Sequence, residues 1–173
     1  YTIIGLNPDK IWDINNNVIT LKTDKKKTKI KTNPLKYLNK LVKDFKIKTP
    51  SQLPSMASMI VGYFSYDIIR YVEKIPNKCK DDLKIPDVRL SRPRTLVIYD
   101  NLKKKIHYIE NVYADTKIEN YKETYEAIIK KFELFKNFEN IKLPEKFTFK
   151  QNKNSVKSNI SKKRFKQLVK KAK

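Results

Sequence analysis

The sequence predicts an α+β fold in which antiparallel strands form one or more sandwich-like sheets that a few helices cover. Apolar stretches bounded by turn residues occupy residues 1–21 and recur at residues 95–112, which is the pattern of antiparallel strands. Residues 34–45 and 118–135 instead place apolar side chains three and four positions apart, which is the spacing of one helix face. Together these stretches predict an antiparallel sheet with two or three covering helices.

The chain opens with predicted strands. Residues 1–6 are strand-like, and residues 11–14 and 18–21 flank the triplet Asn15-Asn16-Asn17. Asparagine tolerates a positive φ and hydrogen-bonds its own backbone, so the triplet predicts a tight turn between two strands. The lysines at positions 25–27 have no aromatic residue beside them and are expected to lie in a solvated loop.

A helix is predicted next. Asn33 is its expected N-cap and Pro34 suits its first turn. Pro50 and Pro54 then require a loop. The apolar positions that form one face of this helix are Leu35, Leu38, Leu41, Val42 and Phe45.

Residues 56–64 are almost continuously apolar and short, which predicts a strand that is buried on both sides. The run contains Gly62, one of only two glycines in the chain. At a typical usage of about 7%, a chain of this length would hold roughly twelve glycines. We therefore expect Gly5 and Gly62 to meet a backbone requirement.

The second half continues with a short helix and a hairpin. Ser65 is the expected cap of a helix over residues 66–73, which Pro76 ends. Residues 95–112 form a predicted β-hairpin with its turn at residues 100–104.

A long helix follows the hairpin, with Asp115 or Thr116 as its expected cap. Its predicted apolar face consists of Ile118, Tyr121, Tyr125, Ile128, Phe132 and Phe135. Beyond it, residues 142–159 are polar and lack periodicity, which favours a linker. Ser161 then caps a helix whose apolar residues are Phe165, Leu168, Val169 and Ala172.

The domain organisation predicted from these patterns is a domain at residues 1–141, a linker at residues 142–159, and the first helix of a second domain at residues 160–173. The first residue is Tyr1, inside a strand-like run, and the last helix has no glycine or proline to end it. We therefore interpret the chain as an internal piece of a longer protein, with the first domain incomplete at its N-terminus.

The net charge of the chain is +22, from 40 Lys and Arg against 18 Asp and Glu. The excess lies in residues 22–50 and 142–173, and a basic surface of this size attracts polyanions such as nucleic acids. Lysine supplies almost all of it, whereas base reading and bidentate phosphate binding favour arginine. Lys, Asn and Ile are abundant while Gly and Ala are scarce, as expected from an AT-rich genome. We interpret the charge as compositional and expect no specific nucleic-acid partner; a basic nucleic-acid-binding module is the alternative from a different class.

Neither a membrane nor an export route is indicated. No apolar run approaches the roughly 18 residues that a membrane span needs. The N-terminus lacks a charged region followed by an apolar segment and a cleavage site. The single cysteine, Cys79, cannot form an internal disulfide and is compatible with a reducing compartment. We therefore expect a cytoplasmic protein.

The residues that usually carry chemistry are sparse. His107 is the only histidine and lies within a predicted strand, and Cys79 has no second cysteine or histidine nearby to form a zinc site or an activated thiol. Two glycines cannot build a phosphate-binding loop. Asp67 is expected to complement the dipole at the start of its helix. A further group of acids on the proline-framed loop is expected to be solvated: Asp81, Asp82 and Asp87. On these grounds the chain holds no self-sufficient active site, and no catalytic, metal-binding or cofactor-binding residue is assigned.

Residues 62–76 read GYFSYDIIRYVEKIP, and they are followed by Asp81-Asp82-Leu83, Pro86-Asp87 and Arg92-Pro93. Together with the opening YTIIGLNPD, these strings resemble the amino-terminal domain of anthranilate synthase component I, an enzyme of the chorismate-utilising family. The resemblance covers nearly all of the chain, and the lysine-rich stretch at residues 25–31 departs from it as an expected loop. The signature residues, to which we assign a structural role, are Gly62, Tyr63, Phe64, Ser65, Tyr66, Asp67, Arg70, Glu73 and Pro76.

The resemblance implies a lyase that converts chorismate and ammonia to anthranilate and pyruvate for tryptophan biosynthesis. A glutamine amidotransferase subunit would supply the ammonia. The resemblance also implies a regulatory and scaffolding domain, with the chorismate and Mg²⁺ ligands beyond Lys173. The tryptophan feedback site would use a strand before Tyr1 and residues of the catalytic half. The alternative within the same superfamily is aminodeoxychorismate synthase component I, of the folate pathway.

Overall fold

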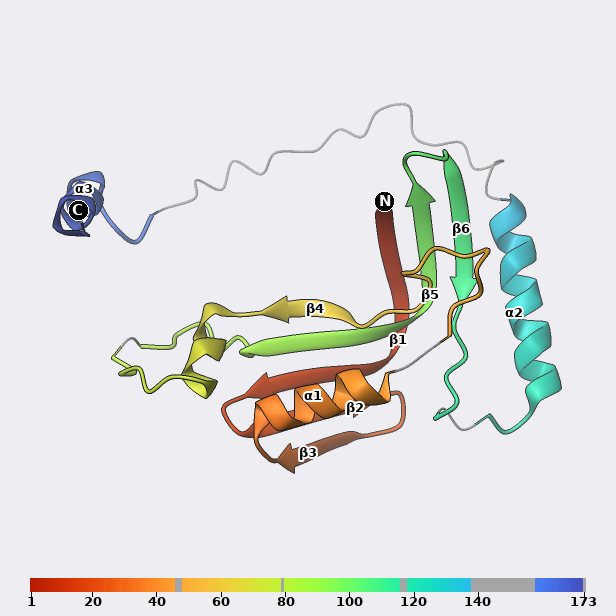
Figure 1. Cartoon of the computed structure of the whole chain (residues 1–173), viewed down its shortest axis with the longest axis horizontal. Helices are drawn as coiled ribbons and strands as arrows, with labels where there is room; N and C mark the ends of the chain where they lie inside the picture. Colours follow the sequence, from red (N-terminus) through yellow and green to blue (C-terminus); the bar gives the residue numbers. More distant parts are fainter. Residues whose placement is uncertain (46–47, 79, 116–117, 138–157, 173) are drawn as a thin grey trace. The chain divides into compact units, whose positions relative to one another are not determined.

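The computed structural model describes residues 1–45, 48–78, 80–115, 118–137 and 158–172 (Figure 1). The chain divides into two compact units, Tyr1–Phe138 and Glu139–Lys173, and each is described by itself. The elements of the first unit are, in chain order, β1 (Thr2–Asn15), β2 (Val18–Thr23), β3 (Lys27–Lys31), α1 (Pro34–Asp44), β4 (Val61–Phe64), the 3-10 helix η1 (Tyr66–Tyr71), β5 (Val88–Asp100), β6 (Lys105–Glu110) and α2 (Tyr121–Lys136).

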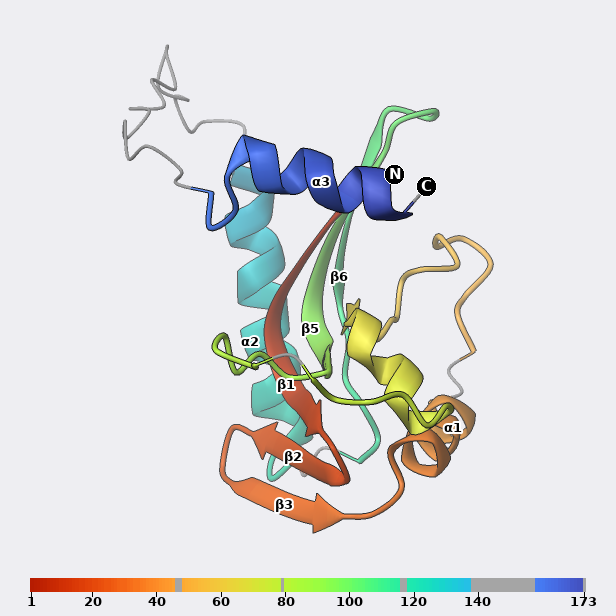
Figure 2. The same ribbon diagram turned by 90° about the vertical axis from the view of Figure 1, so that its left-hand side faces the viewer.

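The described strands form one antiparallel sheet in the order β3-β2-β1-β5-β4, with β6 also paired to β5. The long strands β1 and β5 lie side by side along the sheet, and β2 and β3 extend it at one end (Figure 2). The register of β1 against β5 shifts between Pro8 and Lys10, where β1 departs from regular pairing. An antiparallel sheet with a few helices confirms the predicted α+β class.

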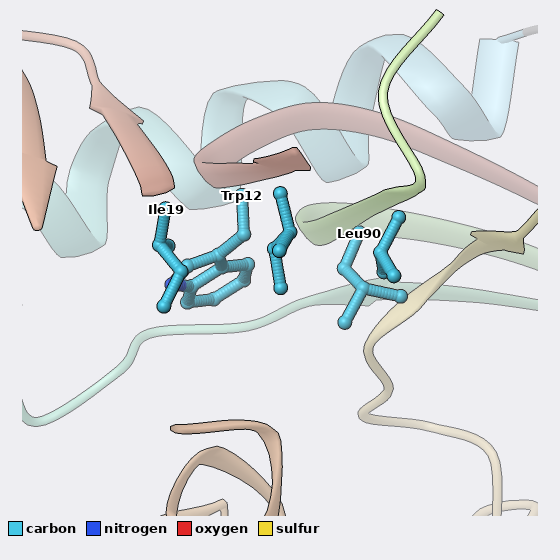
Figure 3. Close-up of a cluster of buried hydrophobic side chains, with 5 residues drawn as sticks. Trp12, Ile19 and Leu90 are labelled. Carbon is cyan, nitrogen blue, oxygen red and sulfur yellow. The ribbon is translucent and has the colours of Figure 1, made fainter. Parts of the chain in front are cut away.

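Two apolar clusters stabilise the first unit. One consists of Trp12, Ile14, Ile19, Val88 and Leu90, against which α1 packs. Figure 3 shows Trp12, Ile19 and Leu90 projecting from their strands to the same side. The other cluster consists of Ala57, Leu96, Ile98 and Ile109, and the loop residues Leu53, Met56 and Met59 pack against it. Burying an aliphatic side chain of this size contributes about 1.5 to 3 kcal/mol.

Three predicted local features are confirmed. The asparagine triplet turns the chain between β1 and β2, with Asn16 at φ 52°. Asn33 caps α1, because its side-chain oxygen accepts a hydrogen bond from the Lys36 backbone N–H at 3.0 Å. The hairpin of β5 and β6 turns at Asp100, whose carboxylate accepts bonds from the backbone of the two residues Leu102 and Lys103.

The prediction of a strand at residues 56–64 that is buried on both sides is wrong. Only Val61–Phe64 forms a strand, and all four of its residues are exposed at an edge of the described sheet. The first half of the apolar run is a loop that covers the cluster around Leu96 instead. Periodicity cannot separate these cases, because a covering loop needs apolar residues as much as a buried strand does.

The lysine-rich stretch is only in part the expected solvated loop: Lys25 and Lys26 are exposed between β2 and β3, whereas Lys27–Lys31 forms the strand β3. In β3, Thr28 and Ile30 are half-buried while Lys27, Lys29 and Lys31 are exposed. This alternation is the strand period of two, and lysines are common on edge strands because they discourage pairing with other chains.

The long helix begins later than predicted. Its N-cap is Asn120, whose side chain accepts bonds from the Lys122 and Glu123 backbone N–H groups, and not Asp115 or Thr116. The predicted apolar positions Tyr121 and Tyr125 are exposed, and Ile118 precedes the helix. The helix contacts β6 through Phe132 and Phe135, whose rings pack on Tyr108.

In the second unit, α3 (Lys162–Ala172) begins at Ser161, whose hydroxyl accepts a bond from the Arg164 backbone N–H at 3.2 Å. The cap predicted for this helix is thus confirmed. The predicted linker at residues 142–159 falls almost entirely outside the described residues, so the domain boundaries stay predictions. Among the helices that the structure describes, none has the length and apolar content needed to cross a membrane.

Candidate functional site

The signature segment lies at the edge of the sheet, in β4, η1 and the turn that follows. Several of its aromatic side chains face solvent: Tyr66 is 90% exposed, Phe64 56% and Tyr63 38%. Exposed aromatic side chains contribute nothing to the two apolar clusters. Within the first unit this segment acts through its backbone, its polar side chains and Ile68, which packs on the cluster around Trp12.

Gly62 lies where two backbones approach closely. It pairs with Leu90 of β5, and a Cβ atom built at this position would lie 1.9 Å from the Arg89 carbonyl oxygen. Its φ is not positive, so the requirement is for space and not for a special backbone conformation. Any side chain here would push β4 away from β5.

Arg70 ties η1 to the turn that follows it. Its Nε donates to the Asp67 carboxylate at 2.8 Å, and its Nη1 donates to the carbonyl oxygens of Ile75 and Pro76, both at 3.1 Å. Asp67 lies in the first turn of η1, as expected, and is paired with Arg70. Glu73, the next signature acid, is exposed. These contacts join η1 to the following turn through Asp67, Arg70 and Pro76.

Asp87 is a structural anchor and not the solvated acid that the sequence predicted. Its carboxylate accepts bonds from the Tyr71 hydroxyl at 2.5 Å and the Asn16 backbone N–H at 3.1 Å. Burial and the bond to this carboxylate both raise the pKa of Tyr71. The Ser65 backbone N–H donates to the Asp87 carbonyl. Ser65 occupies the N-cap position of η1, as predicted, but its side chain makes no capping bond. Asp81 is exposed, as expected.

A charged group centred on the buried side chains of Asp9 and Arg92 was not predicted from the sequence. It consists of five residues, which we call the Arg92 cluster: Asp9, Lys10, Arg92, Tyr113 and Asp115. Arg92 donates to Asp9 at 2.8 and 2.5 Å and to Asp115 at 3.2 and 2.9 Å. Lys10 pairs with Asp115 at 2.5 Å, and the guanidinium lies 3.9 Å from the centre of the Tyr113 ring.

Charge balance within the Arg92 cluster explains how it is tolerated. The side chains of Asp9 and Arg92 are only 4% and 7% exposed, so either charge alone would be costly. Burial opposes the ionisation of Asp115, but the bonds from Arg92 and Lys10 outweigh it and lower the pKa of Asp115 to about 2. Two cations thus meet two carboxylates, of which Asp115 stays ionised at neutral pH because of its low pKa. The cluster is suited to holding the fold and not to transferring protons.

A groove of about 500 Å³ lies beside the signature glycine, lined by Pro8, Ile11, Lys22, Val61, Gly62, Tyr63, Arg89 and Ser91. Its two cations, Lys22 and Arg89, both pair with Asp13, at 2.6 Å and 2.5 Å. Hydrogen bonds from Arg89, opposed by burial, lower the pKa of Asp13. The groove is therefore apolar with a rim of paired charges.

The other candidate residues do not assemble a reactive site. His107 lies half-buried in β6 opposite Ile98, and Cys79 lies outside the described residues. Among residues 1–45, 48–78, 80–115, 118–137 and 158–172, no three His, Cys, Asp or Glu side chains are placed to hold a metal ion. The residues that the structure describes therefore assemble no metal-binding group.

Comparisons with known proteins place this chain in a family. A family model described as chorismate binding enzyme matches residues 7–173. Anthranilate synthase component 1 of Acetivibrio thermocellus is 32% identical over 120 residues, which are 69% of this chain and 24% of that protein. The protein of the same name from Pseudomonas aeruginosa is 34% identical over 124 residues, covering 69% and 25% of the two chains. The chain thus spans about a quarter of the length of these curated relatives.

A solved structure shows the same fold. The crystal structure of anthranilate synthase component I from Streptococcus pneumoniae matches 83% of this chain and 30% of that one, with a TM-score of 0.59 and 23% identity. The antiparallel sheet with few helices therefore corresponds to part of a larger known protein. Because the family model covers all but the first six residues, the chain belongs to the chorismate binding enzyme family.

Proposed function

We propose that this chain is the amino-terminal part of anthranilate synthase component I, which converts chorismate and ammonia to anthranilate and pyruvate in tryptophan biosynthesis. The observation that carries the proposal is the match of residues 7–173 to the chorismate binding family, together with relatives that are named for this activity. The string at residues 62–76 supports it as well, because it resembles the amino-terminal domain of this enzyme.

The chemistry belongs to the rest of the polypeptide. The described residues present a paired ionic cluster, a groove with paired cations and no group suited to hold Mg²⁺. Magnesium prefers several oxygen ligands from carboxylates and substrate, so this part of the chain does not fit the ion. We place the ligands of Mg²⁺ and chorismate, and the catalytic residues, beyond Lys173, and we assign a regulatory and scaffolding role to the first unit.

The partners follow from the same proposal. A glutamine amidotransferase subunit would deliver ammonia, and tryptophan would act as the feedback inhibitor of the whole enzyme. A cytoplasmic location is part of the proposal, because the single cysteine of the chain suits a reducing compartment.

The experiment compares residues 1–173 with the longer polypeptide that continues beyond Lys173. With chorismate, Mg²⁺ and ammonium, the longer protein is expected to form fluorescent anthranilate, and residues 1–173 are not. Aminodeoxychorismate as the product would instead identify the protein as aminodeoxychorismate synthase component I. Either product formed by residues 1–173 alone, above the uncatalysed rate, would refute the division between scaffold and catalytic half.

A further inference from the structure

A second groove, of about 540 Å³, lies between α1 and the outer strand β3. We call it the β3–α1 groove. Its apolar residues are Ile30, Tyr37 and Leu41, which are half-buried and pack on the cluster around Trp12. Its exposed rim carries Lys36 and Lys40, one helical turn apart. The groove therefore combines an apolar floor with a cationic rim.

The outer edge of β3 is open among the strands that the structure describes, since β3 pairs only with β2. The Thr32 N–H donates to the Asn17 carbonyl, just before β2, at 3.0 Å. In an antiparallel pair every second residue bonds to the neighbouring strand, so this bond shows which residues of β3 bond to β2. Backbone groups of Thr28 and Ile30 therefore face β2. Those of Lys27, Lys29 and Lys31 face the open edge and remain available to another strand.

Most of the exposed side chains beside this edge are cationic. Lys27, Lys29 and Lys31 line one face of β3, and Lys36 and Lys40 stand above the other. None of these five lysines forms an ion pair with a described carboxylate, and Asp44 is the one acid that lines the groove. A strand added here would place alternate side chains against the lysine face and the apolar floor.

We propose that the edge of β3 and the β3–α1 groove bind an acidic peptide as an added antiparallel strand. Its acidic residues would lie beside Lys29 and Lys31, and its apolar residues would enter the groove over Ile30 and Leu41. Strand addition of this kind derives affinity from backbone bonds and specificity from alternate side chains. The lysines repel a second copy of β3 and other basic strands, so they select an acidic partner.

A peptide fits this surface better than a nucleic acid does. An open strand edge offers N–H and C=O groups at the spacing of a peptide backbone. The surface holds no arginine, and the Tyr37 ring is half-buried with its hydroxyl accepting a bond from the Trp12 indole N–H at 3.2 Å. The surface therefore offers a nucleic acid neither an arginine to read its bases nor an exposed ring on which they could stack.

The test measures binding of a fluorescein-labelled peptide of alternating Glu and Val residues to residues 1–173, by fluorescence anisotropy at about 150 mM salt. Lys29→Gln removes one charge and is expected to weaken binding about two- to fivefold, the range for an exposed ion pair. Lys29→Pro also removes an N–H that faces the open edge and is expected to weaken binding about fivefold further. Lys103→Gln, an exposed lysine in the β5–β6 turn, is the matched control and is expected to bind as the parent does.

A second readout does not depend on any variant. Amide hydrogen exchange measured by NMR is expected to slow at Lys29 and Lys31 when the peptide binds, and to stay unchanged at Thr28 and Ile30, which already face β2. Equal slowing at all four amides, or none, would overturn the proposal. So would equal binding of a peptide with Lys in place of Glu. A single-stranded oligothymidine that displaces the peptide, and whose own binding weakens in Lys29→Gln but not in Lys103→Gln, would also overturn the proposal, because the surface would then be a nucleic-acid site.

Discussion

Replacing Gly62 by alanine should separate β4 from the sheet. The new Cβ would lie 1.9 Å from the Arg89 carbonyl oxygen, whereas real Cβ contacts of under 3.0 Å are essentially never seen. The atoms must therefore move apart by 1.1 Å, the difference between these two distances. Both sides of the contact are backbone, so no side chain can rotate to relieve it.

The cost follows from the pairing that such a movement breaks. β4 has four residues, each paired with β5, and hydrogen bonds lengthened by about 1 Å leave the bonding range. Losing two or three bonds at about 1 kcal/mol each destabilises the unit by about 2 to 3 kcal/mol. For a unit of this size that lowers the melting temperature by about 8 to 12 °C.

Thermal unfolding followed by circular dichroism measures the effect, and Gly5→Ala is the matched control. A Cβ at Gly5 would meet the Pro93 ring at 2.8 Å, a side-chain contact that a shift of 0.2 Å brings to 3.0 Å. We expect Gly5→Ala to melt within about 3 °C of the parent, a change of under about 1 kcal/mol. If Gly62→Ala and Gly5→Ala had the same melting temperature, the close approach of β4 to the Arg89 carbonyl would not be the reason for glycine at position 62.

Three further predictions concern charge. Arg92→Met removes both bonds that the guanidinium makes to the buried Asp9 carboxylate and is expected to cost about 3 to 5 kcal/mol in urea unfolding, part of which Asp9→Asn in the same chain should restore. The pKa of Asp115 is about 2 in the folded state and ordinary in the unfolded state, so its contribution to stability is present above about pH 4 and is lost as the pH falls toward 2. Asp115→Asn should therefore reduce the change in unfolding free energy between these pH values by about 1 kcal/mol. This value is kept low because the Asp115 side chain is half exposed and solvent weakens its ion pairs. DNA binding by the chain is expected to be independent of sequence and to collapse as salt rises, and a preference above about tenfold for one sequence at about 150 mM salt would contradict a compositional origin of the charge.

Local chemistry explains what the sequence could predict. The Asn16 turn and the Asn33 cap each depend on one side chain and its neighbours, so a short window contains the whole cause. Gly62 could be singled out by the scarcity of glycine, although only the pairing with β5 shows which atom excludes a side chain. The prediction of Asp115 as the α2 cap was wrong because this residue, although of a type that often caps helices, is paired with Arg92 and Lys10.

The Arg92 cluster shows why long-range contacts escaped prediction and what they do. Its members Asp9, Arg92 and Asp115 are separated by 83 and 23 positions, so no local pattern joins them. Once β1 and β5 pair, Lys10 lies directly opposite Arg92, and like charges in register destabilise a sheet. Asp9 on β1 balances the charge of Arg92, and the charge of Lys10 requires an acid from another part of the chain. Asp115, which follows β6 in the chain, is that acid, and it lies beside Lys10 where the register of β1 against β5 shifts. The sheet register thus places two cations side by side, and the later chain resolves this by bringing Asp115 to both of them.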